Sequence, residues 1–252
     1  MKTTEPEHIY NSSIDTVINK FISSDDDFFL TEKDLHFFFF HSCLQEESFV
    51  LQGKLLLHTE YPTPFKVTKN RDILNPVNIA DDNARAMRPH IDSILFNKNF
   101  IQWINGNVTN SRLRDNYIRG LGNKRFSVYI ADFRRIYKRY YDENNQQNIL
   151  SHSLEFKFLR GGYEGVKKPM IDMVYDLKKL LLMTKKNYLI QFPFSKEGTL
   201  LIFIGERGSD KLLRELETLS QTQSELFSNF DATVRESQNH NRYVIRYDVK
   251  KS

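Results

Sequence analysis

The stretch LEFKFLRGG, residues 154–162, places a carboxylate and an amine two residues apart within an apolar run. Successive side chains of a β-strand point to opposite faces, so Glu155 and Lys157 are expected on the same face of a strand. Two opposite charges on one face of a largely buried strand have two explanations. They form a structural ion pair, or they serve a ligand that binds there.

The composition excludes several classes of protein. A chain of 252 residues can bury a sizeable core, and its charged and hydrophobic fractions of 27% and 40% are ordinary for a soluble globular protein. The net charge of +4 does not by itself indicate nucleic acid. Cys43 is the single cysteine, which excludes an intramolecular disulfide framework and a cysteine-built zinc site. Because no apolar run approaches the ~18 residues of a membrane span, and the stretch MKTTEPEHIY has no apolar signal core, we expect a cytoplasmic protein without membrane contact.

Hydrophobic periodicity predicts strands that alternate with helices, which is an α/β pattern. Thr31 is expected to cap a helix over residues 32–45, with Glu32 in the first turn, where an acid suits the helix dipole. Residues 100–104 are apolar, and the alternation in residues 125–133 predicts a strand. Further helices are expected over residues 12–22, 168–184 and 212–221, further strands over 54–61, 88–96, 151–159, 188–194, 199–207 and 242–249, and a polar loop over 66–84.

Two of the expected strands carry acidic residues in a suggestive order, RPHID at 88–92 and then LEFKF at 154–158. This order resembles the PD-(D/E)xK phosphodiesterase superfamily, the restriction-endonuclease-like nucleases. In that family an Asp that ends one strand, together with an acid and a Lys two residues apart on the next strand, binds a divalent metal ion beside the scissile phosphate. The resemblance assigns these roles to Asp92, Glu155 and Lys157. It spans roughly residues 30–205, because a helix containing TEKDL precedes the strands and a crossover helix containing KKPMIDMVYDLKKLL follows them.

The resemblance implies an α/β fold of the restriction-endonuclease type, with a mixed central sheet flanked by helices. We expect residues 54–96 and 150–205 to form one mixed sheet, with the helix 168–184 packed on it. The 62 residues between Asp92 and Glu155 are more than one hairpin needs. The chain is therefore expected to be a single nuclease-like domain, residues 1–252, with an insertion or subdomain at 100–145 that carries a basic segment.

The resemblance also implies an activity, namely endonuclease-like hydrolysis of DNA by a metal-activated water. Asp92, Glu155 and Lys157 would be the catalytic residues, and Asp92 and Glu155 would hold Mg²⁺ or Mn²⁺. Hard oxygen ligands suit magnesium, which polarises a phosphodiester and lowers the pKa of its bound water. An adjacent lysine can position that water and stabilise the developing charge.

Several acidic residues have alternative interpretations. Glu60 in HTEYPT is an additional metal ligand or a solvent-facing acid at a strand end, and the sequence does not separate the two. Asp132 in SVYIADF is a rival for the first acid, but Arg134 and Arg135 follow it after Phe133 and would serve as its salt-bridge partners, so Asp92 is preferred. Asp172 and Asp176, on the helix after LEFKF, are expected to be ordinary solvated charges.

The positive charge of the chain is concentrated in residues 112–142, which contain nine Lys and Arg against three acids, a local excess of +6. Such residues contact phosphates without reading sequence. The interleaved aromatic residues are expected either to offer stacking surfaces for unpaired bases or to form the core of a solvated subdomain whose basic residues keep it soluble; they are Tyr117, Phe126, Tyr129, Tyr137, Tyr140 and Tyr141. The predicted nucleic-acid contacts are Arg134, Arg135, Lys138 and Arg139, with Arg160, Lys167 and Lys168 after the E-x-K motif.

Two other functions stay open beside the metal-dependent nuclease. One is a non-catalytic nucleic-acid-binding protein that keeps the nuclease fold. The other is an unrelated α/β protein whose charged strand pair is structural. The sequence does not indicate cleavage specificity, a preference for single or double strands, or whether the chain forms a homodimer.

Overall fold

In the computed structural model, the chain forms two compact units. Unit 1 comprises Met1–Phe49, Leu154–Leu181 and Gly198–Ser252, and unit 2 comprises Val50–Ser153 and Leu182–Glu197. The structure describes residues 5–24, 29, 31–45, 49–51, 53–63, 65–67, 73–74, 89–118, 126–159, 167–186, 192–206, 209–238 and 241–251, of which residues 66–67, 73–74, 126–134 and 167–168 are described by their backbone alone.

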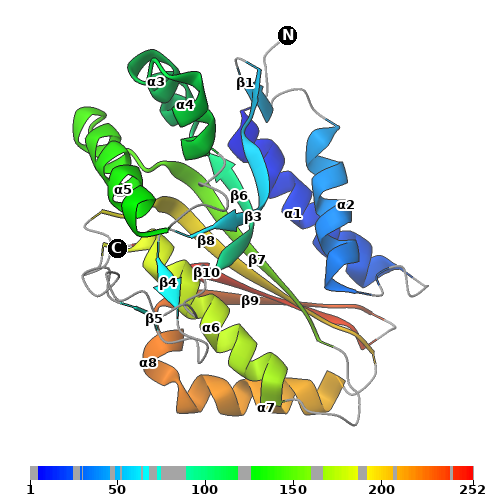
Figure 1. Ribbon diagram of the computed structural model, residues 1–252. Coiled ribbons are helices and arrows are strands. Elements are labelled where there is room, and N and C mark those ends of the chain that lie inside the picture. The colour runs from blue at the N-terminus through cyan, green and yellow to red at the C-terminus, as the bar shows by residue number, and fades with distance from the viewer. Residues whose placement is uncertain are drawn as a thin grey trace. The chain divides into compact units, whose positions relative to one another are not determined.

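The described strands include a six-stranded sheet with the order β3-β6-β7-β8-β10-β9 (Figure 1). Residues in its strands alternate between two faces, as the period-two pattern of the sequence predicts. The strands are β3 (Leu57–Pro62), β6 (His90–Phe96), β7 (Leu150–Leu159), β8 (Ser195–Ile204), β9 (Phe230–Glu236) and β10 (Tyr243–Val249).

The sheet is mixed. β3 pairs with β6, and β10 pairs with β8 and β9, in antiparallel ladders. β7 and β8 instead run parallel, as two backbone hydrogen bonds show. Leu150 N–H donates to Phe194 O where both strands begin, and Gly205 N–H donates to Leu159 O where both strands end. The helix α6 (Lys167–Thr184) makes the crossover between them. The expectation that residues 54–96 and 150–205 contribute to one mixed α/β sheet is confirmed.

In unit 1, the two faces of β7 contact different helices. Phe156 packs against Phe39 of α2 (Glu32–Leu44), with ring centroids 5.5 Å apart, and Phe158 packs against Phe21 of α1 (Pro6–Ser23) at 6.0 Å. Leu159, on the opposite face, joins a buried cluster with Met173 and other apolar residues of α6, β8 and α7 (Ser209–Thr222). Helices therefore cover both faces of this part of the sheet (Figure 1). The short helix α8 (Ser224–Phe227) follows α7.

The beginning of α2 is built as the sequence predicts. Thr31 accepts a hydrogen bond from Asp34 N–H, and Asp34 Oδ2 accepts one from Thr31 N–H, which completes a capping box. Glu32 follows in the first turn. Leu35, Phe39 and Cys43 are the buried residues of this helix.

In unit 2, the strand predicted over residues 125–133 is wrong. Of the residues expected as a strand at 125–133, residues 126–133 belong to the helix α5 (Phe126–Glu143), and the apolar stretch 100–104 lies in the helix α3 (Lys98–Asn107). The apparent alternation was local, whereas Phe133, Tyr137 and Tyr140 repeat at the spacing of a helix. Unit 2 also contains α4 (Ser111–Ile118) and two small hairpins, β1 (Val50–Leu51) with β2 (Lys54–Leu55) and β4 (Lys66–Val67) with β5 (Ile73–Leu74).

Two further predictions need correction. Residues 192–194 are not in a strand, although a strand was expected over 188–194, of which residues 188–191 lie outside the described part. The strand β9 was not expected, because Phe230 is its only buried residue and its pattern is therefore polar. It is the last strand of the sheet order, and edge strands need no apolar alternation.

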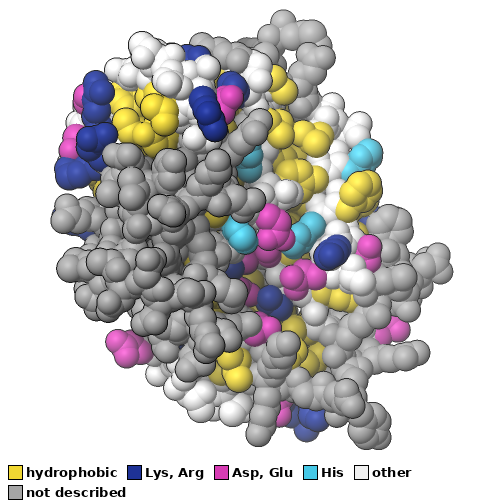
Figure 2. Space-filling view, viewed as in Figure 1, with side chains coloured by type: hydrophobic (Ala, Val, Ile, Leu, Met, Phe, Trp, Pro, Cys, Tyr) yellow, Lys and Arg dark blue, Asp and Glu magenta, His cyan; other side chains and the backbone are white. Residues whose placement is uncertain are grey.

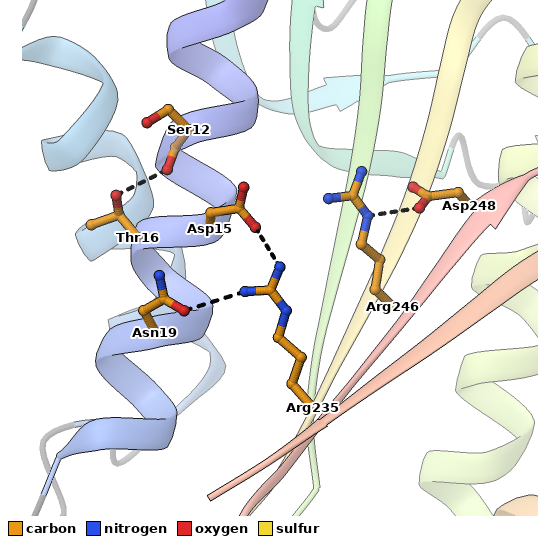
Figure 3. A network of polar contacts seen from close by, with 7 residues as sticks. All are labelled: Ser12, Asp15, Thr16, Asn19, Arg235, Arg246 and Asp248. Carbon is orange, nitrogen blue, oxygen red and sulfur yellow. Dashed lines mark hydrogen bonds and ion pairs between the residues drawn. The ribbon is translucent and has the colours of Figure 1, made fainter.

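The edge strand β9 is tied to α1 by polar contacts (Figure 3). Arg235 donates to Asp15 Oδ1 at 3.1 Å and to Asn19 Oδ1 at 3.2 Å. On β10, Arg246 Nε donates to Asp248 Oδ2 at 2.7 Å. Arg235 and Asp15 are half exposed, so this ion pair contributes little to stability. None of the described helices combines the length and apolar character that a membrane crossing requires.

Candidate active site

The E-x-K motif lies in the second half of β7, within unit 1. Glu155 and Lys157 point to the face of the strand that α6 covers, since both form ion pairs with α6 residues. Phe156, between them, points to the opposite face, where it contacts Phe39. The sequence prediction that the two charges share one face is confirmed.

Glu155 is a buried carboxylate. It is 1% exposed, and its Oε1 atom lies 2.7 Å from Nζ of Lys179, which is itself 5% exposed. A charge buried this deeply would be costly without an opposite charge beside it. The ammonium group of Lys179 also lies 5.5 Å from the ring centroid of Tyr175.

Lys157 lies among carboxylates. Its Nζ is 2.9 Å from Asp176 Oδ2 and 3.8 Å from Glu32 Oε2. Burial by itself lowers the pKa of Lys157, but the charges of Asp176, Glu32 and Glu155 outweigh that effect and raise the pKa above its ordinary value. Lys157 is therefore a cation at neutral pH.

Asp176 connects the two lysines. Its Oδ1 atom is 3.1 Å from Lys179 Nζ, while its Oδ2 atom is 2.9 Å from Lys157 Nζ. The residue is 5% exposed, so the expectation that Asp176 is a solvated charge is wrong. Asp172, one turn earlier on α6, is of intermediate exposure.

Glu32 brings a third carboxylate from α2. In addition to its contact with Lys157, its Oε2 atom accepts a hydrogen bond from Phe158 N–H at 3.3 Å. A ligand atom of His36, one turn further along α2, lies within 4.8 Å of a Glu32 carboxylate oxygen. Glu32 thus has a tertiary role besides its place in the first turn of α2.

We call Glu32, Glu155, Lys157, Asp176 and Lys179 the E-x-K cluster. All five residues belong to unit 1. With two ammonium groups against three carboxylates, the cluster carries a formal charge of −1. Carboxylate oxygens are the donors that magnesium prefers, so the chemistry of this donor set fits a divalent cation.

Unit 2 holds the other predicted ligands, Asp92 on β6 and Glu60 on β3. The ladder pairs Thr59 with Ser93 and Tyr61 with Ile91, so the register places Glu60 opposite Asp92. We call these two residues the Glu60–Asp92 pair. Asp92 is of intermediate exposure and Glu60 is exposed.

The backbone of Glu60 is unusual, with a φ of +49°. This left-handed conformation is costly for a residue with a side chain, and such strain in a folded protein is concentrated at functional sites. It interrupts an otherwise regular ladder between β3 and β6 at the position opposite Asp92. The role of Glu60 as an additional metal ligand stays a prediction.

The rival first acid, Asp132, lies on α5, and its side chain is outside the described part of the structure. Asp132 was a candidate because residues 125–133 were expected to be a strand. Since that strand is a helix, Asp132 does not end a strand, and the argument for it as the first acid no longer holds.

The predicted nucleic-acid contacts on α5 are partly described. Arg135 is exposed, and the side chain of Arg134 lies outside the description. Lys138 pairs with Asp142 at 2.5 Å and Arg139 with Glu143 at 2.7 Å, each one turn along the helix. Over α5, at the upper left of Figure 2, dark-blue basic side chains accordingly lie beside magenta acidic ones. Lys138 and Arg139 therefore each have an acidic partner on the same helix.

The predicted contacts after the E-x-K motif are not tested. Arg160 lies outside the described residues, and Lys167 and Lys168 begin α6 without described side chains. They stay predictions.

Three of the six aromatic residues that were expected to stack on bases are in the core instead. Tyr137 and Tyr140 are fully buried, with rings 5.3 Å and 5.1 Å from that of Phe100. Tyr117 is 6% exposed, and its carbonyl accepts a hydrogen bond from Tyr137 Oη at 2.8 Å. Buried rings cannot stack on a base, so this expectation is wrong for these three residues, whereas the side chains of Phe126 and Tyr129 are not described and Tyr141 is of intermediate exposure.

Asp176 and Lys179 were missed by the sequence argument, although a signal was present. Asp176 lies three residues after Met173 and four before Leu180, both of which are buried. Helical residues at these spacings share a face, so Asp176 belongs to the apolar stripe of α6. A charged residue within such a stripe indicates a buried partner.

No protein-family model, no curated protein and no solved structure matches the chain, so its function has to be inferred from the geometry of its own residues.

Proposed function

We propose that the protein is a metal-dependent phosphodiesterase, an endonuclease of the PD-(D/E)xK type that hydrolyses DNA by a metal-activated water. The single observation that carries the proposal is the E-x-K cluster, in which Glu155 and Lys157 share one face of β7 and lie among further carboxylates. A purely structural pair would need only one acid and one base. The cluster has an excess carboxylate, which suits a cation.

The order of the elements supports the same proposal. Along the chain, α2 precedes β3, β6 carries Asp92, β7 carries the E-x-K motif, and α6 leads to β8. This is the order that the resemblance implies, with a leading helix, an Asp strand, an E-x-K strand and a crossover helix. The helices α3, α4 and α5 lie within the 62 residues between the two motifs, as an insertion would.

Glu155 would be a ligand of Mg²⁺ or Mn²⁺, and Asp92 and Glu60, which belong to unit 2, stay predicted ligands. A bound divalent cation would polarise the phosphodiester and lower the pKa of its water. Lys157 is the residue that would orient that water and stabilise the developing negative charge, since surrounding carboxylates keep it protonated. As a cation it cannot accept a proton, so its role in this proposal is electrostatic.

The decisive experiment is cleavage of supercoiled plasmid and of labelled oligonucleotides with Mg²⁺ or Mn²⁺, with EDTA as the blank. We expect cleavage by the native chain and none by Glu155→Gln or Asp92→Asn. Lys157→Met should lose activity and still bind Mn²⁺, measured by calorimetry. Asp172→Asn is the matched control, because it neutralises an Asp on α6 outside the E-x-K cluster, and it should cleave normally.

Two outcomes would select the other functions. Salt-dependent DNA binding without metal-dependent cleavage would indicate a nucleic-acid-binding protein that keeps the fold. Neither binding nor cleavage would mean that the E-x-K cluster is a structural ion network. The cytoplasmic location and a homodimer stay predictions.

The basic residues of α5 are the proposed DNA contact. If Arg134, Arg135, Lys138 and Arg139 each meet a phosphate, replacing all four by Ala should reduce the salt slope of duplex binding by about 3–4. Affinity should fall equally for unrelated sequences, because phosphate contacts carry no sequence information. A control with four exposed basic residues of unit 1, Lys20, Lys33, Lys211 and Arg214, changed to Ala removes the same charge elsewhere. An equal loss of slope in both variants would show that net charge alone is responsible.

A further inference from the structure

We propose that Asp176 is a positioning residue for both charged side chains of the E-x-K motif, an inference that rests on the proposed function. Asp176 would hold Lys157 in place directly and Glu155 through Lys179. In this arrangement Asp176 keeps the amine of Lys157 away from the carboxylate that would bind a metal ion. Asp176 would touch neither the substrate nor the metal.

The inference depends on a row of four side chains whose charges alternate in sign. Lys179 Nζ lies 2.7 Å from Glu155 Oε1 and 3.1 Å from Asp176 Oδ1, and Lys157 Nζ lies 2.9 Å from Asp176 Oδ2. Asp176 contacts both lysines, and it uses one carboxylate oxygen for each. Its carboxylate thereby separates the two ammonium groups.

Because these four side chains are largely buried, each ammonium group depends on a particular carboxylate. Glu155, Asp176 and Lys179 are at most 5% exposed, and the side chain of Lys157 is 17% exposed. With little water to solvate it, a lysine that lost its carboxylate would move to the nearest remaining one. For Lys157 and Lys179 the remaining acids of the cluster are Glu155 and Glu32. Loss of Asp176 would therefore place two amines in competition for Glu155.

α6 provides a rigid support for this role. Asp176 and Lys179 lie one turn apart on the helix, and both are anchored by the apolar stripe that includes Met173, Leu177 and Leu180. Removing a residue that orients a metal ligand without touching the metal typically lowers metal affinity or activity by about 10- to 100-fold. The expected effects are taken from that range.

The test uses Asp176→Asn in the full chain, with Asp172→Asn as the control on the same helix. We expect kcat for plasmid cleavage to fall about 10- to 100-fold with a nearly unchanged KM. Calorimetric titration with Mn²⁺ alone should show about tenfold weaker binding, because Lys157 now competes for Glu155. Asp176→Glu, which keeps the charge, should recover part of both losses.

A double-mutant cycle separates positioning from general stability. If Asp176 acts by restraining Lys157, then Asp176→Asn in a Lys157→Met background should change Mn²⁺ affinity less than about threefold. The double variant also removes one charge of each sign, so it should fold if Asp176→Asn alone does not. An equal loss of Mn²⁺ affinity in both backgrounds would overturn the inference.

The two proposals fail in distinguishable ways. Cleavage by the native chain, combined with unchanged kcat and Mn²⁺ affinity in Asp176→Asn, would refute the positioning role and leave the nuclease function intact. Absence of metal-dependent cleavage by the native chain would refute the proposed function and the positioning role with it.

Discussion

The E-x-K cluster and the Glu60–Asp92 pair contain acids of the same predicted function in different physical settings. In the cluster, Glu155 is buried and held by a buried lysine. In the pair, Glu60 is exposed on a left-handed backbone and stands opposite a second acid. The buried acid is compensated by the charge of a neighbouring lysine, whereas the exposed acid lies on a strained backbone.

Substitutions in the two regions should therefore have similar effects on activity and different effects on stability. Removal of a compensated buried charge leaves its partner desolvated, so the fold should be weakened. Removal of a strained or repelled group should leave the fold unchanged or stabilise it. Loss of activity would look the same in both regions, but the free energy of unfolding would change in opposite directions.

The largest expected effect is on Glu155. Glu155→Gln should lower the free energy of unfolding by about 3 kcal/mol, because Lys179 stays buried with one carboxylate fewer. Urea unfolding monitored by circular dichroism measures this change, and Glu215→Gln on an exposed part of α7 is the control. If repulsion among the acids dominated instead, the variant would be as stable as the native chain, and the description of the cluster as charge-compensated would be wrong.

Cys43 shows what burial does to an ionisable group that prefers its neutral form. Burial raises the pKa of the Cys43 thiol to about 12, although a hydrogen bond with Ser13 lowers it in part. Because the pKa in the folded protein is the higher one, this contribution to stability is present below pH 9 and is lost as pH rises toward 12. Above pH 9 the native chain should lose roughly 1.4 kcal/mol per pH unit more than Cys43→Ala.

The free energy of unfolding of the native protein and of Cys43→Ala, measured at pH 8, 9, 10 and 11, gives this difference directly, because the two proteins share every other titrating group. Equal slopes for the two chains would mean that the thiol ionises in the folded protein as readily as in water. The buried position of Cys43 would then not exclude a reactive thiolate.

Glu60→Gly should stabilise the protein by about 1 kcal/mol, because glycine adopts the left-handed conformation without strain. Glu60→Gln keeps the side chain on the strained backbone and should leave stability nearly unchanged. Gln146→Gly relieves a φ of +60° in the turn after α5 and serves as the control for strain alone. If Glu60→Gly stabilises the chain without loss of cleavage, Glu60 is not a ligand and its strain has no role in the activity.

The smallest expected effect on stability is at Asp92. Asp92→Asn should abolish cleavage while the free energy of unfolding changes by less than about 0.5 kcal/mol or rises, since a negative charge opposite Glu60 is removed. Activity and urea unfolding are measured on the same preparation. A loss of stability as large as that of Glu155→Gln would remove the contrast between the two regions.

The sequence by itself was sufficient for those elements whose pattern is long and regular. The apolar stripe of α6, the Thr31 cap of α2 and the alternation of β7 all lie within a few turns or one strand, and all three form as expected. Period-two alternation also placed Glu155 and Lys157 on one face of β7. These features depend on local spacing, which a sequence shows directly.

Tertiary structure decided which charges meet. Glu32 and Lys157 are 125 positions apart and become neighbours only when α2 packs on β7, and the register of β3 on β6 alone brings Glu60 opposite Asp92. Contacts between α6 and β7 turned Asp176 from an expected surface charge into a buried one, and contacts between α5 and α3 made core residues of Tyr137 and Tyr140. Burial and ion pairing depend on contacts between distant segments, and hydrophobic periodicity within one segment carries no information about its partner.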